Sequence, residues 1–154
     1  MSQSSSRTNI HRLTMMALLT ALLCVSAYLI IPLQPVPIVL ITFVACLISF
    51  MLSPGATFLV FIVYILLGIV GVPVFSGGRS GLATILGPSG GYIISWPIAF
   101  TILSWLKGKK AGFWSYTWRA VVITIPIVYL FGVLGLIYIA GLPVSKAIYV
   151  GVFP

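Results

Sequence analysis

The sequence contains no aspartate and no glutamate, and only eight of its 154 residues are lysine or arginine. Its charged fraction is 5%, whereas about a quarter of the residues of a typical soluble domain are charged. The absence of carboxylates excludes paired acid and base catalysts, carboxylate metal sites and the acidic relays typical of proton-driven pumps. We therefore expect a chain that has no catalytic residues and needs no cofactor or metal.

Histidine and cysteine are also scarce. The one histidine, His11, stands beside the first apolar run, where an interfacial role is expected rather than a ligand role. Cys24 and Cys46 both lie inside apolar runs without a Cys-x-x-Cys spacing, which favours small core residues. No pair of nucleophile and base stands out, so an intramembrane enzyme is the least favoured function.

Hydrophobic residues are abundant and make up 61% of the chain. Several apolar runs approach the roughly 20 residues that cross a bilayer as a helix. We predict an all-α fold, a polytopic transmembrane helical bundle that forms a single integral membrane domain over residues 1–154. The polar, serine-rich segment 1–12 is predicted to be a disordered cytoplasmic tail. The five predicted spans cover residues 13–31, 38–52, 55–72, 92–106 and 119–140.

A sixth helix is predicted to begin at Pro143. Only 12 residues remain from that proline to the end of the chain, which is about 18 Å of helix at ~1.5 Å per residue. That length does not cross a membrane. We therefore expect five full spans plus a truncated sixth.

The basic residues flank the apolar runs, which indicates membrane topology rather than nucleic-acid binding. With the N-terminus in the cytoplasm of a prokaryotic cell, six of them lie inside and two, Arg79 and Lys146, lie outside or near the outer face. Aromatic residues in and around the basic segment 107–118 are predicted to form an interfacial belt. The six inner basic residues and the belt are Arg7, Arg12, Lys107, Lys109, Lys110 and Arg119, and Trp105, Trp114, Tyr116 and Trp118.

The stretch 71–92, GVPVFSGGRSGLATILGPSGGY, is the one long polar and glycine-rich break between the spans. Its seven glycines and two prolines allow turns with positive φ and close approach to another surface. We predict a structured outer loop at 71–91 that contains about one helical turn near residues 82–86. Arg79 has no carboxylate partner in the chain, so it is either a solvated loop charge or a clamp for an anionic group of a solute.

On the first helix, Ala17 and Ala21 are four residues apart. Small residues at this spacing let another helix pack closely in lipid. The spacing alone leaves open whether that second helix belongs to this chain or to a partner.

Several motifs together resemble a known family. PVPI after the first helix, the SPG turn, GVPVF, GPSGGY and the final GVFP occur in the same order in the BioY family, the biotin-specific S component of energy-coupling factor (ECF) transporters. The resemblance implies a six-helix membrane protein that binds biotin from outside with high affinity and is not an enzyme. It also implies partners, namely a T component, which would contact Ala17 and Ala21, and a pair of ATP-binding cassette ATPases.

Biotin has a ureido ring, an apolar thiophane and chain, and a carboxylate, and it suits a pocket with apolar walls and few polar groups. An S component for another small vitamin and a non-transporting membrane scaffold remain as alternatives. The residues predicted to bind the substrate come from the loop, from the start of the fourth span and, as a weaker candidate, from the third span: Gly77, Gly78, Arg79, Ser80 and Gly81, then Ser89, Gly91 and Tyr92, then Tyr64.

Overall fold

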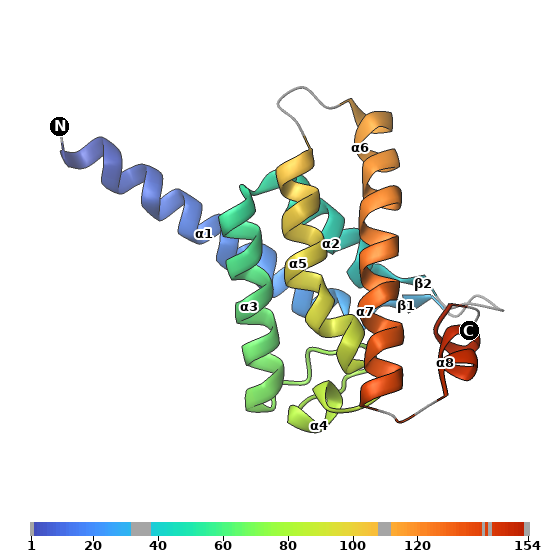
Figure 1. Cartoon of the computed structure of the whole chain (residues 1–154). Coiled ribbons are helices and arrows are strands. Elements are labelled where there is room, and N and C mark those ends of the chain that lie inside the picture. Colours follow the sequence, from blue (N-terminus) through green and yellow to red (C-terminus); the bar gives the residue numbers. More distant parts are fainter. Residues whose placement is uncertain (1, 32–37, 108–111, 140, 142, 153–154) are drawn as a thin grey trace.

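The computed structural model describes residues 2–31, 38–107, 112–139, 141 and 143–152, and it is almost entirely helical (Figure 1). A two-residue antiparallel pair, β1 and β2, joins the first two helices, with Ile30 opposite Val39 and Ile31 opposite Ile38. The elements in chain order are α1 (Ser2–Ser26), β1 (Ile30–Ile31), β2 (Ile38–Val39), α2 (Leu40–Met51), α3 (Pro54–Val70), α4 (Leu82–Ile85), α5 (Gly90–Leu106), α6 (Phe113–Arg119), η1 (Ala120–Thr124), α7 (Ile125–Tyr138) and α8 (Val144–Val152).

Helix α5 is the centre of the bundle. It packs against α2, α3 and α7, and Figure 1 shows it between α3 and α7. The core between these helices contains Phe61 of α3 and Phe100 and Leu103 of α5, none of which is more than 2% exposed. The rings of Phe61 and Phe100 are stacked with their centroids 5.0 Å apart.

Many large apolar side chains also face outward. Phe43, Leu66 and Leu130 are 66%, 53% and 61% exposed although they lie on helices of the bundle. Helices that are apolar on both the inner and the outer face are typical of proteins surrounded by lipid. Among the described residues, one helical rod, Trp114–Tyr138, is long and apolar enough by itself to cross a bilayer, and the other apolar helices are shorter, at 10–17 residues.

This long rod consists of α6, η1 and α7. The π-helical segment η1 comes immediately before the start of α7, where Pro126 is in the first turn. Proline has no N–H for the usual bond to the carbonyl four residues earlier, and a wider local turn accommodates that loss. The rod therefore continues through the proline instead of ending at it.

Local turn chemistry sets the two ends of α3. Pro54 occupies the first turn, where its missing N–H costs nothing, after Ser53 in an extended conformation. At the other end, Gly71 adopts φ 111° and donates its N–H to the carbonyl of Gly68. A left-handed glycine of this kind terminates the helix and turns the chain into the following loop.

The described residues confirm the helical bundle and the single helical turn within the segment 71–91, but they differ from the predictions in three places. Helix α1 begins at Ser2, so the prediction of a disordered tail at 1–12 was wrong; extending an existing helix is easier than starting one. Residues 113–118, which fall between two predicted spans, are helical. The β1–β2 pair was not predicted. The Pro-rich segment 32–37, together with Lys109 and Lys110, lies outside the described residues.

Helices α5 and α7 approach each other through glycine. A Cβ built on Gly91 would lie 2.3 Å from the carbonyl oxygen of Phe131, and one built on Gly135 would lie 2.8 Å from the Cα of Gly91. Both neighbouring groups are backbone atoms, which cannot rotate away. Only glycine at both positions allows this helix spacing.

We therefore expect Gly91→Ala and Gly135→Ala each to destabilise the folded chain by about 1–3 kcal/mol, because the added methyl group forces the two helices apart. Thermal unfolding in detergent measures the change. Gly55→Ala is the matched control, since a Cβ there meets nothing within 4 Å. Equal melting temperatures for all three variants would contradict the close contact.

Candidate functional site

The loop after α3 contains a very tight turn. The backbone N–H of Phe75 donates to the carbonyl of Arg79 at 3.0 Å, and the carbonyl of Phe75 accepts from the N–H groups of Gly78 and Arg79 at 3.0 and 3.2 Å. Gly77 and Gly78 have φ values of 76° and 72°, in the left-handed region that favours glycine. The turn therefore projects Arg79 from a fixed backbone.

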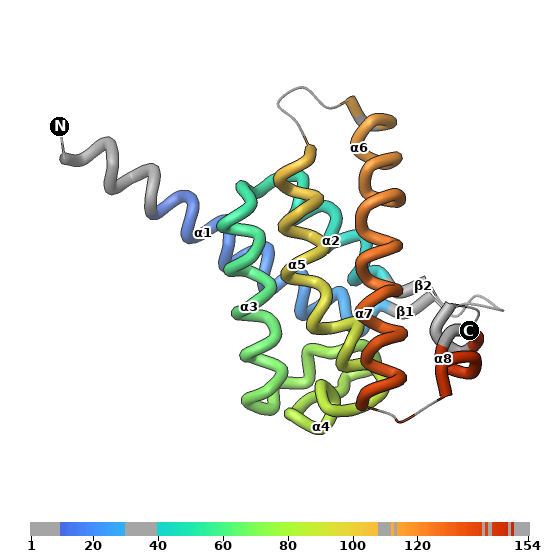
Figure 2. The backbone as a smooth tube through the Cα atoms, in the orientation of Figure 1, coloured from blue at the N-terminus to red at the C-terminus, as the bar shows by residue number. Residues whose placement is uncertain are grey.

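Three contacts fasten this loop to α3 and to the turn that follows α1. The hydroxyl of Tyr64 on α3 donates to the carbonyl of Val74 at 2.7 Å, and the hydroxyl of Tyr28 donates to the carbonyl of Pro73. The N–H of Gly81 donates to the carbonyl of Gly68 at 2.7 Å. Figure 2 shows the segment folded across the lower ends of α3 and α5.

The ring of Phe75 packs on the same part of α3. A Cβ at Gly68 would lie 2.1 Å from the Cζ atom of this ring, so the ring fits only over a glycine. The Phe75 side chain is 2% exposed and meets the Tyr64 ring edge to face, with centroids 5.8 Å apart. Aromatic packing thus reinforces the hydrogen bonds that hold the loop.

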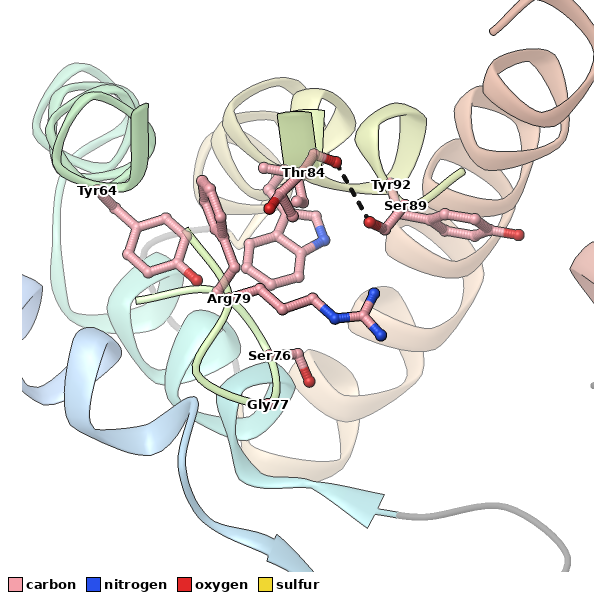
Figure 3. A pocket seen from close by; sticks show the side chains of 10 residues that line it. Tyr64, Ser76, Gly77, Arg79, Thr84, Ser89 and Tyr92 are labelled. Carbon is pink, nitrogen blue, oxygen red and sulfur yellow. Dashed lines mark hydrogen bonds between the residues drawn. The ribbon is translucent and has the colours of Figure 1, made fainter. Parts of the chain in front are cut away.

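The short helix α4 forms the other side of the loop. The hydroxyl of Thr84 donates to the carbonyl of Ser80 at 2.8 Å, and the hydroxyl of Ser89 donates to the carbonyl of Thr84 at 3.3 Å (Figure 3). A Cβ on Gly90 would lie 1.6 Å from the carbonyl oxygen of Ile85. The GPSGG sequence therefore lets α4 fold directly onto the start of α5.

A pocket of about 460 Å³ lies between the loop, α4 and the beginning of α5. Its volume is within the range of about 300–1,000 Å³ that is usual for small-molecule sites. One side is aromatic: the rings of Tyr64 and Trp96 are stacked with their centroids 5.9 Å apart. The residues that line the pocket are Tyr64, Phe75, Ser76, Gly77, Arg79, Thr84, Ser89, Tyr92, Ile93 and Trp96.

Arg79 is the one charged residue in this lining. Figure 3 shows its guanidinium reaching across the pocket, with Ser76 on one side and Ser89 and Tyr92 on the other. Within the part of the chain that the structure describes, no hydrogen bond joins this guanidinium to another residue. Since the sequence contains no carboxylate, a ligand can supply the planar anion that arginine binds best.

The pocket brings together five of the predicted binding residues: Tyr64, Gly77, Arg79, Ser89 and Tyr92. The other four do not line it. Gly78 lies beside Tyr28, and Gly81, with φ 84°, is the N-cap residue immediately before α4. The carbonyl of Ser80 accepts the bond from Thr84, and Gly91 contacts α7. Their direct contact with a ligand stays a prediction.

The prediction omitted five lining residues: Phe75, Ser76, Thr84, Ile93 and Trp96. For Ile93 and Trp96 a signal was present, because positions 89, 92, 93 and 96 share one face of a helix. Phe75, Ser76 and Thr84 carry no such signal, because the way the loop and α4 fold against α5 decides where they point.

The remaining predicted features lie elsewhere. Ala17 and Ala21 are exposed on α1, so no described helix of this chain covers them. Trp105, Trp114 and Trp118 are exposed, whereas Tyr116 is half-buried and donates its hydroxyl to the carbonyl of Cys46 at 2.6 Å. Among the described residues, no group of three histidine, cysteine or acidic side chains could hold a metal ion.

Comparison with known proteins identifies a family that this sequence matches. A sequence model of the BioY family matches residues 1–154. The biotin transporter BioY2 of Lactococcus lactis subsp. cremoris is 39% identical over 98 residues, which are 64% of this chain and 54% of that protein. The chain thus spans about half the length of this relative.

Two further relatives match over more of their length. The probable biotin transporter BioY of Pyrococcus horikoshii is 37% identical over 92% of this chain and 82% of its own length. The biotin transporter BioY of Thermotoga maritima is 35% identical over 88% of this chain and 79% of its own length.

The fold also has a solved counterpart. The S-component for biotin from an ECF-type ABC transporter superposes with a TM-score of 0.82, covering 99% of this chain and 83% of that chain at 24% identity. The relatives are named as transporters, which makes this chain a membrane protein. With the family match extending over the whole sequence, the chain belongs to the BioY family.

Proposed function

We propose that this chain is the substrate-specific subunit of an ECF-type uptake transporter and that it binds biotin in the pocket beside Arg79. The observation that carries the proposal is an aromatic-walled pocket with a single cation, in a member of the BioY family. The names of the relatives, which are biotin transporters, support the choice of substrate.

The chemistry of the pocket fits the three parts of biotin. The stacked rings of Tyr64 and Trp96 provide an apolar surface for the thiophane and its chain. Ser76 and Ser89 line the pocket, and their hydroxyls bond the ureido group. Arg79 binds the carboxylate, because a guanidinium pairs with it through two parallel hydrogen bonds.

In this proposal, Tyr64 serves the pocket in two ways. Its ring forms part of the wall, while its hydroxyl is committed to the carbonyl of Val74. The hydroxyl therefore holds the loop in place rather than contacting the vitamin. A loop that is already attached lowers the ordering cost of binding.

The chain works with partners and lies in the cell membrane of a prokaryote as a multi-pass protein. Helices α1, α2, α3 and α5 and the rod α6–α7 form its five spans, and α8 belongs to a sixth. Its N-terminus is cytoplasmic, and the loop that contains Arg79 faces outward. The exposed Ala17 and Ala21 form the surface for the T component, which couples the chain to the ATPases.

Replacement of the cation tests the biotin site most directly. We expect Arg79→Gln to weaken biotin binding by roughly 10- to 100-fold, since a hydrogen bond to a charged group contributes about 1.5–3 kcal/mol. Binding of tritiated biotin to membranes that contain the full chain gives the dissociation constant.

Biotin methyl ester, which lacks the carboxylate charge, is the matched ligand for this test. It should bind the unmodified chain and Arg79→Gln with similar, weaker affinity. If Arg79→Gln lowers the affinity for biotin and for the methyl ester by the same factor, a carboxylate contact at Arg79 is contradicted. If neither ligand binds the unmodified chain, the biotin proposal fails, and binding of another vitamin would point to a different S component.

The loop attachment has its own test. Tyr64→Phe keeps the ring but leaves the carbonyl of Val74 without its donor, at a cost of about 1–3 kcal/mol. We expect biotin affinity to fall by up to roughly tenfold, because fewer chains have the loop in the binding position. Hydrogen exchange of residues 72–81 should become faster in parallel. Tyr138→Phe, at a position 83% exposed on α7, is the control that should change neither.

The proposed orientation predicts a labelling pattern. In intact cells, Ser76→Cys should react with a membrane-impermeant maleimide, whereas Ser115→Cys should react only after permeabilisation. Both serines are exposed, and the native Cys24 and Cys46 are half-buried, so the unmodified chain gives the background signal. The opposite pattern would invert the orientation.

A further inference from the structure

Three cations from different parts of the chain meet at the end of the bundle opposite to the pocket. Lys107 follows α5, and its Nζ atom donates to the carbonyls of Ser49 at 3.1 Å, Phe50 at 2.9 Å and Leu52. Ser49 and Phe50 lie in the last turn of α2, where carbonyls lack the usual helical donor, and Leu52 follows the helix. The carbonyl of Leu52 also accepts from the hydroxyl of Ser104 at 2.8 Å. A cation at this position satisfies them and complements the negative end of the helix dipole.

Arg119 and Arg12 bond groups that are next to this contact in the chain. The Nη1 atom of Arg119 donates to the carbonyls of Leu106 at 2.8 Å and Lys107 at 3.2 Å. The Nη2 atom of Arg12 donates to the hydroxyl of Ser53 at 2.9 Å. We call Arg12, Lys107 and Arg119 the basic rim.

Every partner described for the basic rim is a neutral oxygen. The sequence has no aspartate or glutamate, so no side chain of this protein neutralises the three charges. Burial lowers the pKa of Lys107 from its ordinary value, because the charged form is partly desolvated. A nearby anion would offset this effect at Lys107.

The surroundings of the basic rim indicate where that anion comes from. Trp105, Trp114 and Trp118 are 74%, 83% and 70% exposed, and they lie close in sequence to Lys107 and Arg119. Exposed tryptophans of membrane proteins concentrate at the level of the lipid headgroups. Clustered Lys and Arg beside membrane helices attract anionic lipids, each contributing about 1 kcal/mol near the surface.

We propose that the basic rim is a binding site for the phosphate of an anionic phospholipid headgroup. The lipid phosphate lies across Arg12 and Arg119, while Lys107, already bonded to the end of α2, adds its charge from beneath. Bound lipid thereby links α1 and α6 to the ends of α2 and α5. This site lies outside the biotin pocket and does not depend on the identity of the transported substrate.

The experiment uses the full chain without partner proteins, in nanodiscs of phosphatidylcholine with increasing phosphatidylglycerol. The melting temperature reports stabilisation, and native mass spectrometry counts retained lipids. We expect phosphatidylglycerol to stabilise the chain. Arg12→Gln combined with Arg119→Gln should reduce its affinity roughly 30-fold, since two cations are lost. Lys107 is left unchanged, because its bonds to α2 support the fold.

Two double variants distinguish lipid binding at the basic rim from attraction of lipid by the total positive charge of the chain. Arg79→Gln combined with Lys146→Gln removes the same number of charges elsewhere and should retain the lipid effect. Arg12→Lys combined with Arg119→Lys keeps the charge and should restore most of it, which also excludes simple misfolding. Equal loss in the Arg79 and Lys146 variant would overturn the proposal.

Two further results would also overturn it. Stabilisation of the same size by millimolar inorganic phosphate in phosphatidylcholine alone would assign the basic rim to a free anion. The second result is that phosphatidylglycerol has no effect on the isolated chain, while the Arg12 and Arg119 variant loses binding of the T component. The basic rim would then be a protein interface.

Discussion

The candidate pocket depends on the attachment of the glycine-rich loop to α3. The Tyr64 hydroxyl holds the carbonyl of Val74, and the Phe75 ring occupies the space left by Gly68, so the loop cannot shift without losing both contacts. Arg79 follows in a turn that requires left-handed glycines. The position of the only cation in the lining is thus set by a tyrosine, a glycine and a ring that lie on or against α3, and ligand binding needs little further ordering of the backbone.

The lack of carboxylates shapes the rest of the molecule. In other proteins arginine and lysine can pair with acidic side chains, but here Lys107 and Arg119 bond backbone carbonyls at the ends of α2 and α5. These bonds satisfy helix ends while leaving the positive charge uncompensated. The two ends of the bundle consequently carry separate, unneutralised cations, one in the pocket and three in the basic rim. Each is suited to an anion that the chain does not contain.

Much of the fold could be predicted because its signals are local. Apolar length located α3 and α5 to within two residues, and Ser53 to Gly55 marked the turn before α3. The β1–β2 pair could not be found in this way, since each strand has two residues and its partner lies beyond a loop. In the site, the glycine-rich motif identified Gly77, Arg79 and Ser89, whereas Phe75 and Thr84 required knowledge of how the loop folds.

By itself, the sequence determined the class of the protein: without acidic residues and with long apolar runs, it forms helices in a membrane and carries cations at their ends. Only the tertiary structure decided the roles of residues that look alike. Gly77 lines the pocket and Gly91 sits against Gly135, yet both belong to the same motif-rich stretch. The reason is physical: helix periods and turns depend on neighbours along the chain, whereas pocket walls form where segments distant in sequence come into contact.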